Sequence, residues 1–175
     1  MDKEEIMPAS ILVTYTTSYG STQEVAEAIA KTIHDNGFEV DLLHMRKVTG
    51  IEGYKAVVAG APMYMFKWHK DMPHFLNKFR EALEKLPVAV ISLGPFHDEE
   101  KEWQEVRSGL KKELAKYPWF KPVVHEVFGG KFDPATLRFP MNLVPGLKKL
   151  GATDIRNWDA IKAWAVSLIE KLQLK

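Results

Sequence analysis

Hydroxyl-bearing residues gather directly after the first apolar run of the chain, where a predicted strand meets a predicted helix. They form an uncharged stretch that we call the hydroxyl loop: Thr16, Thr17, Ser18, Tyr19, Gly20, Ser21 and Thr22. A helix N-terminus offers free N–H groups and the positive end of the helix dipole, and hydroxyls with a glycine beside it complete a neutral cradle for a dianion. We therefore predict that this loop binds a small phosphate monoester.

A purely structural interpretation of the loop stays open, since Ser21 and Glu24 fit the Ser-x-x-Glu pattern of a helix capping box. One cap would use few of these hydroxyls, so their density favours phosphate binding. Larger phosphate motifs are missing, because the sequence has neither Gly-x-Gly-x-x-Gly nor Gly-Lys-Ser/Thr. No Asp ends the preceding apolar run, which argues against a phospho-accepting receiver domain.

Two further segments have residue types that suit a flat ring. An apolar and sulfur-rich run follows the third strand-like stretch, and it would be costly as exposed surface. Its first residues are Pro62, Met63, Tyr64 and Met65, of which Tyr64 is our first choice for ring contact. For Phe66 and Trp68, further along the run, a core or capping role is equally compatible.

The second of these segments follows the fourth strand-like stretch, and it comprises Ser92, Leu93, Gly94, Pro95 and Phe96. Gly94-Pro95 predicts a turn at the end of this strand. His97 and the three acidic residues after it predict an exposed loop and helix start rather than a catalytic site. The remaining histidines show no metal-ligand spacing, and we assign no catalytic residue and no metal site.

Short apolar runs predict five strands that position these segments: 11–15, 38–42, 55–60, 87–92 and 123–128. Helical stripes over 25–33, 72–83, 103–114 and 158–172 predict strict alternation of strand and helix. We expect a three-layer, doubly wound α/β fold with a parallel sheet of order 2-1-3-4-5, since the second and fifth runs carry the polar interruptions of edge strands. Ligands of such sheets bind at the carboxyl edge near the switch point, where all three segments begin.

The composition predicts one domain over residues 1–175, with an N-terminal tail at 1–9. The chain has no cysteine, which excludes disulfide scaffolds, iron–sulfur ligation and thiol nucleophiles. Its net charge of +1 gives no overall attraction to nucleic acid. The acidic, polar start lacks the features of a secretory signal, so we expect a cytoplasmic location.

Residues 131–150 break the alternation and form an inserted segment. It is apolar, contains three prolines and carries four basic residues against one acidic, a net charge of +3, so the remainder of the chain carries −2. A basic and apolar segment of this kind could rest on an anionic membrane surface. A lid over the flank of the sheet is the alternative interpretation.

The order of elements and the hydroxyl loop together resemble flavodoxins, whose phosphate loop reads T-x-T-G-x-T after the first strand. The likeness extends over nearly the whole chain. It is nearest to the flavodoxin-domain group that includes menaquinone-dependent protoporphyrinogen oxidase, which has a loop of the form S-T-x-x-G-x-T, an extra segment where 131–150 lies and a helix start like Asn157-Trp158-Asp159. The resemblance implies FMN, with the ring between the Pro62–Met65 and Ser92–Phe96 segments.

The resemblance also implies electron transfer through a non-covalently bound flavin, to a redox partner protein or a quinone. If the chain is an enzyme, it is an FMN-dependent oxidoreductase, and a protoporphyrinogen oxidase-type activity is the alternative function. Small flavodoxins are typically strongly acidic, so the charge of +1 favours that membrane-adjacent alternative. An interaction domain that has lost FMN is the alternative from another class. The sequence leaves the oligomeric state open.

Overall fold

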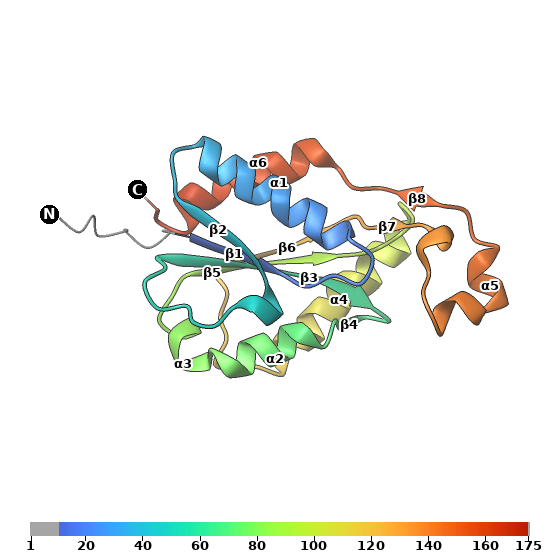
Figure 1. The fold of residues 1–175 in the computed structure, drawn as a ribbon, viewed down its shortest axis with the longest axis horizontal. Helices are drawn as coiled ribbons and strands as arrows, with labels where there is room; N and C mark the ends of the chain where they lie inside the picture. Colours follow the sequence, from blue (N-terminus) through green and yellow to red (C-terminus); the bar gives the residue numbers. More distant parts are fainter. Residues whose placement is uncertain (1–10, 175) are drawn as a thin grey trace, which may run out of the picture.

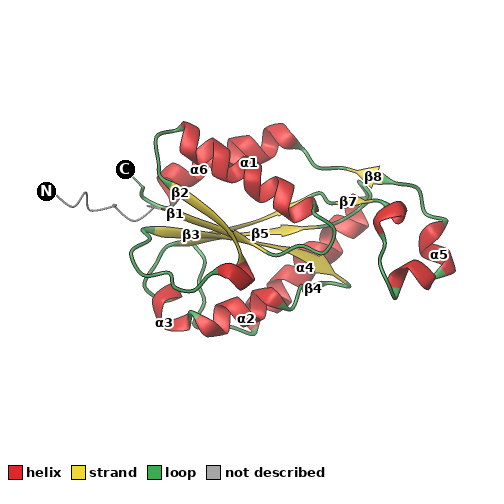
Figure 2. Cartoon of the chain, viewed as in Figure 1, coloured by secondary structure: helices red, strands yellow, loops and turns green. Residues whose placement is uncertain are grey.

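The computed structural model describes residues 11–174, so the expected tail at 1–9 lies outside the described residues. Within this range, five parallel strands run in the order β2-β1-β3-β5-β6, and the short β4 pairs antiparallel with the end of β3. Figure 2 shows this sheet between layers of helices. The strands of this sheet are β1 (Ile11–Tyr15), β2 (Val40–His44), β3 (Ala56–Tyr64), β4 (Lys67–Trp68), β5 (Val88–Leu93) and β6 (Val124–Phe128). With β4 set aside, this is the predicted order 2-1-3-4-5, which is confirmed.

Helices cover both faces of the sheet, as the continuous apolar character of its central strands requires. One face carries α1 (Ser21–Asp35) and α6 (Trp158–Lys171), and the other carries α2 (Asp71–Lys78), α3 (Arg80–Leu83) and α4 (Glu100–Ala115) (Figure 1). Each interface is a separate cluster of buried side chains. Full burial of one large aliphatic side chain contributes about 1.5–3 kcal/mol, so the two clusters fix the sheet and its carboxyl edge.

Two sequence-based expectations for the helices were wrong in detail. The stripe over 72–83 forms two helices, because the chain leaves helical geometry at Phe79, with φ −110° and ψ 21°. Strict alternation also fails between β2 and β3, where residues 45–55 contain only the short 3-10 helix η1 (Met45–Lys47) and no α-helix. The apolar residues of that connection, Met45, Val48 and Ile51, are buried without an α-helix.

The inserted segment leaves the sheet at its carboxyl edge and returns to it. Its elements are β7 (Lys131–Phe132), η2 (Pro134–Thr136), η3 (Met141–Leu143) and α5 (Pro145–Lys148), and β7 pairs antiparallel with β8 (Thr153–Asp154). Figure 1 shows α5 projecting beyond the end of the sheet at which α1 begins. Among residues 11–174, no helix is long and apolar enough to cross a membrane.

Candidate functional site

The hydroxyl loop joins β1 to α1 through a backbone that only glycine adopts easily. Gly20 lies directly before the helix with φ +89°, in the left-handed region that side chains disfavour. The Thr17 hydroxyl accepts a hydrogen bond from the Gly20 N–H at 2.9 Å, which closes the loop on itself. The first N–H groups of α1 are thus presented at the carboxyl edge of the sheet.

Two hydroxyls of the loop are buried without a partner. Ser21 Oγ and Thr22 Oγ1 are both inaccessible to solvent, and neither has a hydrogen-bond partner among the described residues. Most buried hydroxyls in proteins are hydrogen-bonded, because an unsatisfied one costs roughly 1–3 kcal/mol. A phosphate at the α1 N-terminus would give both donors an acceptor, so these residues fit the phosphate of a nucleotide cofactor.

The capping-box interpretation of the loop was wrong. Helix α1 begins at Ser21 itself, and no side chain of the described residues caps its first turn. The Glu24 carboxylate instead pairs with the guanidinium of Arg156, whose side chain is almost fully buried. Since Arg156 balances the negative charge in the first turn of α1, the turn remains suited to an anion.

The structure gives the Thr16 hydroxyl a different environment from the others. Thr16 is fully buried, and its hydroxyl donates to the carboxylate of Asp71 at 3.0 Å. The side chains of Ser18 and Tyr19 remain half-exposed beside the helix start. Phosphate contact by the loop stays a prediction for each of its residues, and for Thr16 the hydroxyl already has a protein acceptor.

The second predicted segment is a β-hairpin rather than a loop, which corrects the expectation from sequence. Strand β3 continues through Pro62 and Met63, both buried, to Tyr64, and the chain returns in β4. The two turn residues, Met65 and Phe66, have φ of +48° and +63°. Positive φ at both positions is what a type I′ turn requires, and each non-glycine residue there costs about 1–2 kcal/mol. A strained turn with Met65 at 89% exposure marks the tip of this hairpin as a functional candidate.

Tyr64 brings the hairpin close to the hydroxyl loop. Burial raises the pKa of its hydroxyl, and the side chain of Ser18 lies beside that hydroxyl and acts in the opposite direction. Of the two aromatics with open roles, Trp68 is a core residue, 5% exposed, and its indole N–H donates to Ser92 Oγ at 2.9 Å. Phe66 is half-exposed at the turn.

The third predicted segment is tied to the base of the inserted segment. Ser92 and Leu93 end β5 and are buried, whereas Gly94 begins the loop with φ +134°. The Gly94 N–H donates to the Phe128 carbonyl at 3.1 Å, and the Pro95 carbonyl accepts from Gly130 N–H at 2.8 Å. The Phe96 ring packs on Phe132 of β7, with centroids 5.6 Å apart. This loop therefore links the predicted ring site to the inserted segment.

His97 lies in the exposed loop before α4, as predicted from the acidic residues that follow it. Its Nδ1 is 2.8 Å from Glu102 Oε1. The surrounding hydrogen bonds lower the pKa of Glu102 against the effect of its partial burial. This pair joins the loop to the first turns of α4.

Three features of the site were missed by the sequence analysis. The first is a buried carboxylate, Asp71, behind the hydroxyl loop. The second is Gly109 of α4, where a Cβ would lie 2.8 Å from the carbonyl oxygen of Phe66, so only glycine lets the hairpin tip pack this closely. The third is Arg156, which bonds Asp154 and Glu24 and lies 4.7 Å from the Trp158 ring. Each feature had a signal in the sequence. For Asp71 it was an acidic residue at a predicted helix start after an aromatic run, for Gly109 a glycine inside a predicted helix, and for Arg156 an arginine between acidic residues.

Comparisons with known proteins agree with this geometry. The model of the flavodoxin domain matches residues 12–142, and the chain belongs to this family of flavin-dependent redox proteins. Protoporphyrinogen IX dehydrogenase [quinone] of Escherichia coli strain K12 is 25% identical over 158 residues, which covers 87% of each chain. An uncharacterised protein of Methanocaldococcus jannaschii is 29% identical over 131 residues, covering 70% of this chain and 31% of the other.

Solved structures of similar fold include flavodoxins and flavo di-iron proteins. Flavodoxin 1 of Bacillus cereus superimposes with a TM-score of 0.59 at 14% identity, covering 91% of this chain and 97% of the other. A flavo di-iron protein of Thermotoga maritima gives a TM-score of 0.56 at 15% identity, covering 94% of this chain and 36% of the other. At these identities the structures support the flavodoxin fold.

Proposed function

We propose that this chain binds FMN non-covalently and transfers electrons through it. The observation that carries the proposal is the pair of orphaned hydroxyls, Ser21 Oγ and Thr22 Oγ1, at the N-terminus of α1. Membership of the flavodoxin family supports a flavin, and a cradle built for one phosphate supports the mononucleotide. The flavin supplies the redox chemistry, and the protein supplies binding, orientation and a surrounding electrostatic field.

The roles of the site residues follow from their positions. Ser21, Thr22 and the N–H groups of the helix start would hold the phosphate. Tyr64 and the hairpin tip would contact the ring on one side, and the Gly94–Phe96 loop would border it on the other. The Arg156–Glu24 pair keeps uncompensated negative charge away from the phosphate.

Thr22→Val tests the proposal, because valine keeps the shape of threonine and removes only the hydroxyl. Hydrogen bonds to charged groups contribute about 1.5–3 kcal/mol, so we expect FMN affinity to fall roughly 10- to 100-fold. The apoprotein should be as stable as the wild type or about 1 kcal/mol more stable, since an unsatisfied buried hydroxyl is lost. Flavin fluorescence titration and thermal melting measure the two effects.

Thr32→Val is the matched control on the same helix. The Thr32 hydroxyl donates to the Ala28 carbonyl at 2.8 Å, away from the loop, so this change should leave FMN affinity unaltered. A wild-type protein that acquires no flavin spectrum in the presence of FMN would instead support the interaction-domain alternative and end the electron-transfer proposal.

A quinone-dependent, protoporphyrinogen oxidase-type activity is the second candidate, and the surface of the inserted segment favours it. Large apolar side chains are exposed there beside basic ones: Phe139 at 77%, Leu143 at 66%, Met141, Val144 and Leu150. The E. coli relative, which is named for protoporphyrinogen IX and quinone, supports the same candidate. Anaerobic reduction of the FMN-loaded protein, followed by addition of a soluble menaquinone analogue, tests the acceptor by the return of flavin absorbance. Porphyrin fluorescence with protoporphyrinogen added tests the substrate.

We also propose that the inserted segment contacts the anionic surface of a membrane, where an apolar quinone would be available. The exposed apolar side chains supply insertion, and Arg138, Lys148 and Lys149 supply attraction to acidic headgroups. A cytoplasmic location with peripheral membrane contact is consistent with this arrangement, and it stays a prediction.

A further inference from the structure

A buried carboxylate lies directly behind the hydroxyl loop. Asp71, the first residue of α2, is 8% exposed and belongs to neither apolar cluster. Its Oδ2 accepts from Arg46 Nε at 2.8 Å and from Thr16 Oγ1 at 3.0 Å. The backbone N–H of Asp71 donates to His69 Nδ1 at 3.2 Å, and that same nitrogen is 3.1 Å from Thr16 Oγ1. We call Thr16, Arg46, His69 and Asp71 the carboxylate cluster.

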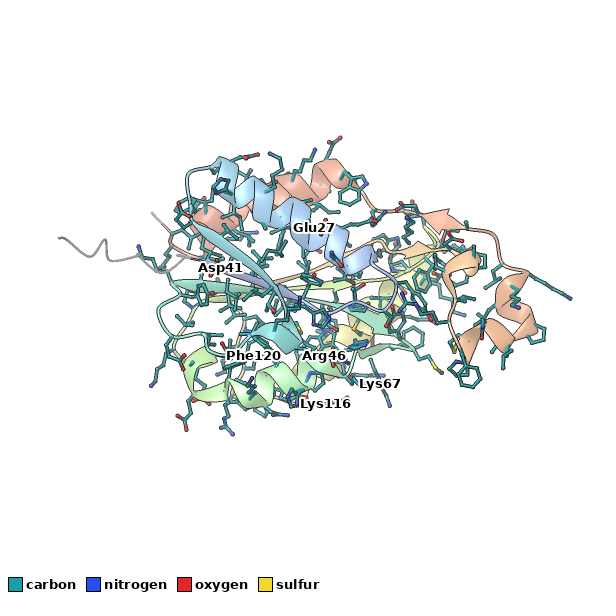
Figure 3. The ribbon with its side chains drawn as sticks, viewed as in Figure 1. Glu27, Asp41, Arg46, Lys67, Lys116 and Phe120 are labelled. Carbon is teal, nitrogen blue, oxygen red and sulfur yellow. The ribbon has the colours of Figure 1, made fainter. Side chains whose placement is uncertain are left out.

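The carboxylate cluster joins three separate connections at the carboxyl edge of the sheet. Thr16 opens the hydroxyl loop after β1, Arg46 belongs to η1 after β2 (Figure 3), and His69 and Asp71 follow the hairpin. Thr16 is held at both ends, since its N–H also donates to the Gly60 carbonyl of β3 at 2.9 Å. The position of the first loop residue is therefore set by the sheet on one side and by Asp71 on the other.

Helix energetics alone do not account for this arrangement. An acid in the first turn of α2 is favoured by the helix dipole, and that preference would hold for an exposed carboxylate. Burying the carboxylate instead requires compensation, which Arg46 and the Thr16 hydroxyl provide. Since Arg46 balances the charge of Asp71, the pair adds no net negative charge beside the hydroxyl loop, and the carboxylate can accept the Thr16 hydroxyl without opposing a nearby anion.

We propose that Asp71 is a positioning residue that holds Thr16, and through it the hydroxyl loop, in the shape that receives the phosphate. The inference rests on the proposed FMN function and adds a residue outside the loop to its binding machinery. Asp71 does not touch the phosphate; it acts through the Thr16 hydroxyl. The sequence analysis placed Thr16 in the phosphate site. In this proposal Thr16 contributes by holding the loop in position, and the backbone of the loop binds the phosphate.

Comparison of FMN with riboflavin separates this role from general stability, because riboflavin has the same ring and lacks the phosphate. For Asp71→Asn and for Thr16→Val, we expect FMN affinity to fall about tenfold and riboflavin affinity to stay within about twofold of wild type. The double variant should be no weaker than the poorer single one, since both changes break one interaction. Thr16→Ser, which keeps the hydroxyl, should restore wild-type affinity.

Asp35→Asn is the matched control, because that carboxylate is exposed and pairs with Lys31 at the far end of α1. It should change neither affinity. Wild-type FMN affinity in Thr16→Val and Asp71→Asn, additive losses in the double variant, or equal losses for FMN and riboflavin would each overturn the positioning role. Absence of FMN binding in the wild type would overturn the proposed function itself, which distinguishes the two failures.

Discussion

At the scale of single residues, we expect His69 to make the stability of the fold depend on pH. Its Nδ1 accepts a hydrogen bond from the Asp71 N–H, so that nitrogen carries no proton. Protonation of Nδ1 would place its own N–H against the N–H of Asp71 and break this hydrogen bond. Burial is the main cause that lowers the pKa of His69, with Arg46, Lys70 and His44 adding to it and Asp71 opposing it. Burial likewise lowers the pKa of His44, next to Arg46.

The sign of the pH effect follows from these lowered pKa values. Well above about pH 6.5, the ordinary pKa of histidine, both histidines are neutral in the folded and unfolded chain, and their contribution to stability is fully present. As the pH falls below that value, the unfolded chain takes up protons first and the free energy of unfolding declines. His69→Asn keeps an acceptor near Nδ1 and cannot titrate, so we expect a shallower decline in urea denaturation between about pH 6.5 and 5. If His69→Asn left the slope of unfolding free energy against pH unchanged, His69 would not be the group responsible. His125→Asn, at an exposed site on β6, is the control.

At the scale of elements, the hairpin tip depends on the absence of a side chain in α4. A Cβ on Gly109 would lie 2.8 Å from the carbonyl oxygen and 2.9 Å from the Cβ of Phe66, so backbone atoms of the turn would have to move. Alanine gains about 1 kcal/mol of helix propensity over glycine, but overpacking costs about 1–3 kcal/mol. We expect Gly109→Ala to lower the free energy of unfolding by about 1 kcal/mol and to shift the visible spectrum of bound FMN.

The matched control for this change is Ser108→Ala, at the neighbouring, exposed position of the same helix. It removes one oxygen from the solvent face and should leave both stability and the flavin spectrum as they are. Full stability together with an unaltered spectrum in Gly109→Ala would show that the turn does not depend on this contact.

The same elements show how far sequence reasoning reaches. The strand order was predictable because buried parallel strands are continuously apolar, as in 55–60 and 87–92, and edge strands are not. The hairpin was not, since Met65-Phe66 lacks the Asn-Gly or Gly-Gly signal of a type I′ turn and its geometry is held by a contact with Gly109, 43 positions after Phe66. The carboxylate cluster depends likewise on residues far apart in sequence that meet only in the fold.

At the scale of the whole molecule, charge and exposed apolar surface are concentrated at one end. The inserted segment carries a net +3 within a chain of net +1, and it projects beyond the carboxyl edge of the sheet (Figure 1). Arg156 ties the return of this segment to α1, through Asp154 on one side and Glu24 on the other. Any surface that the segment contacts is therefore held close to the predicted flavin site.

Membrane contact through this end can be tested by vesicle sedimentation with a matched pair of charge changes. Basic residues near an anionic surface contribute about 1 kcal/mol each, so Lys148→Gln with Lys149→Gln should weaken binding to phosphatidylserine-containing vesicles roughly 30-fold. Lys111→Gln with Lys112→Gln, exposed on α4, makes the same change in net charge elsewhere and should have little effect. Higher salt should weaken wild-type binding, because attraction between exposed charges is screened. Equal losses of vesicle binding in the two double variants would show that only net charge matters. Unchanged vesicle binding by the Lys148→Gln, Lys149→Gln variant would exclude the inserted segment as the contact.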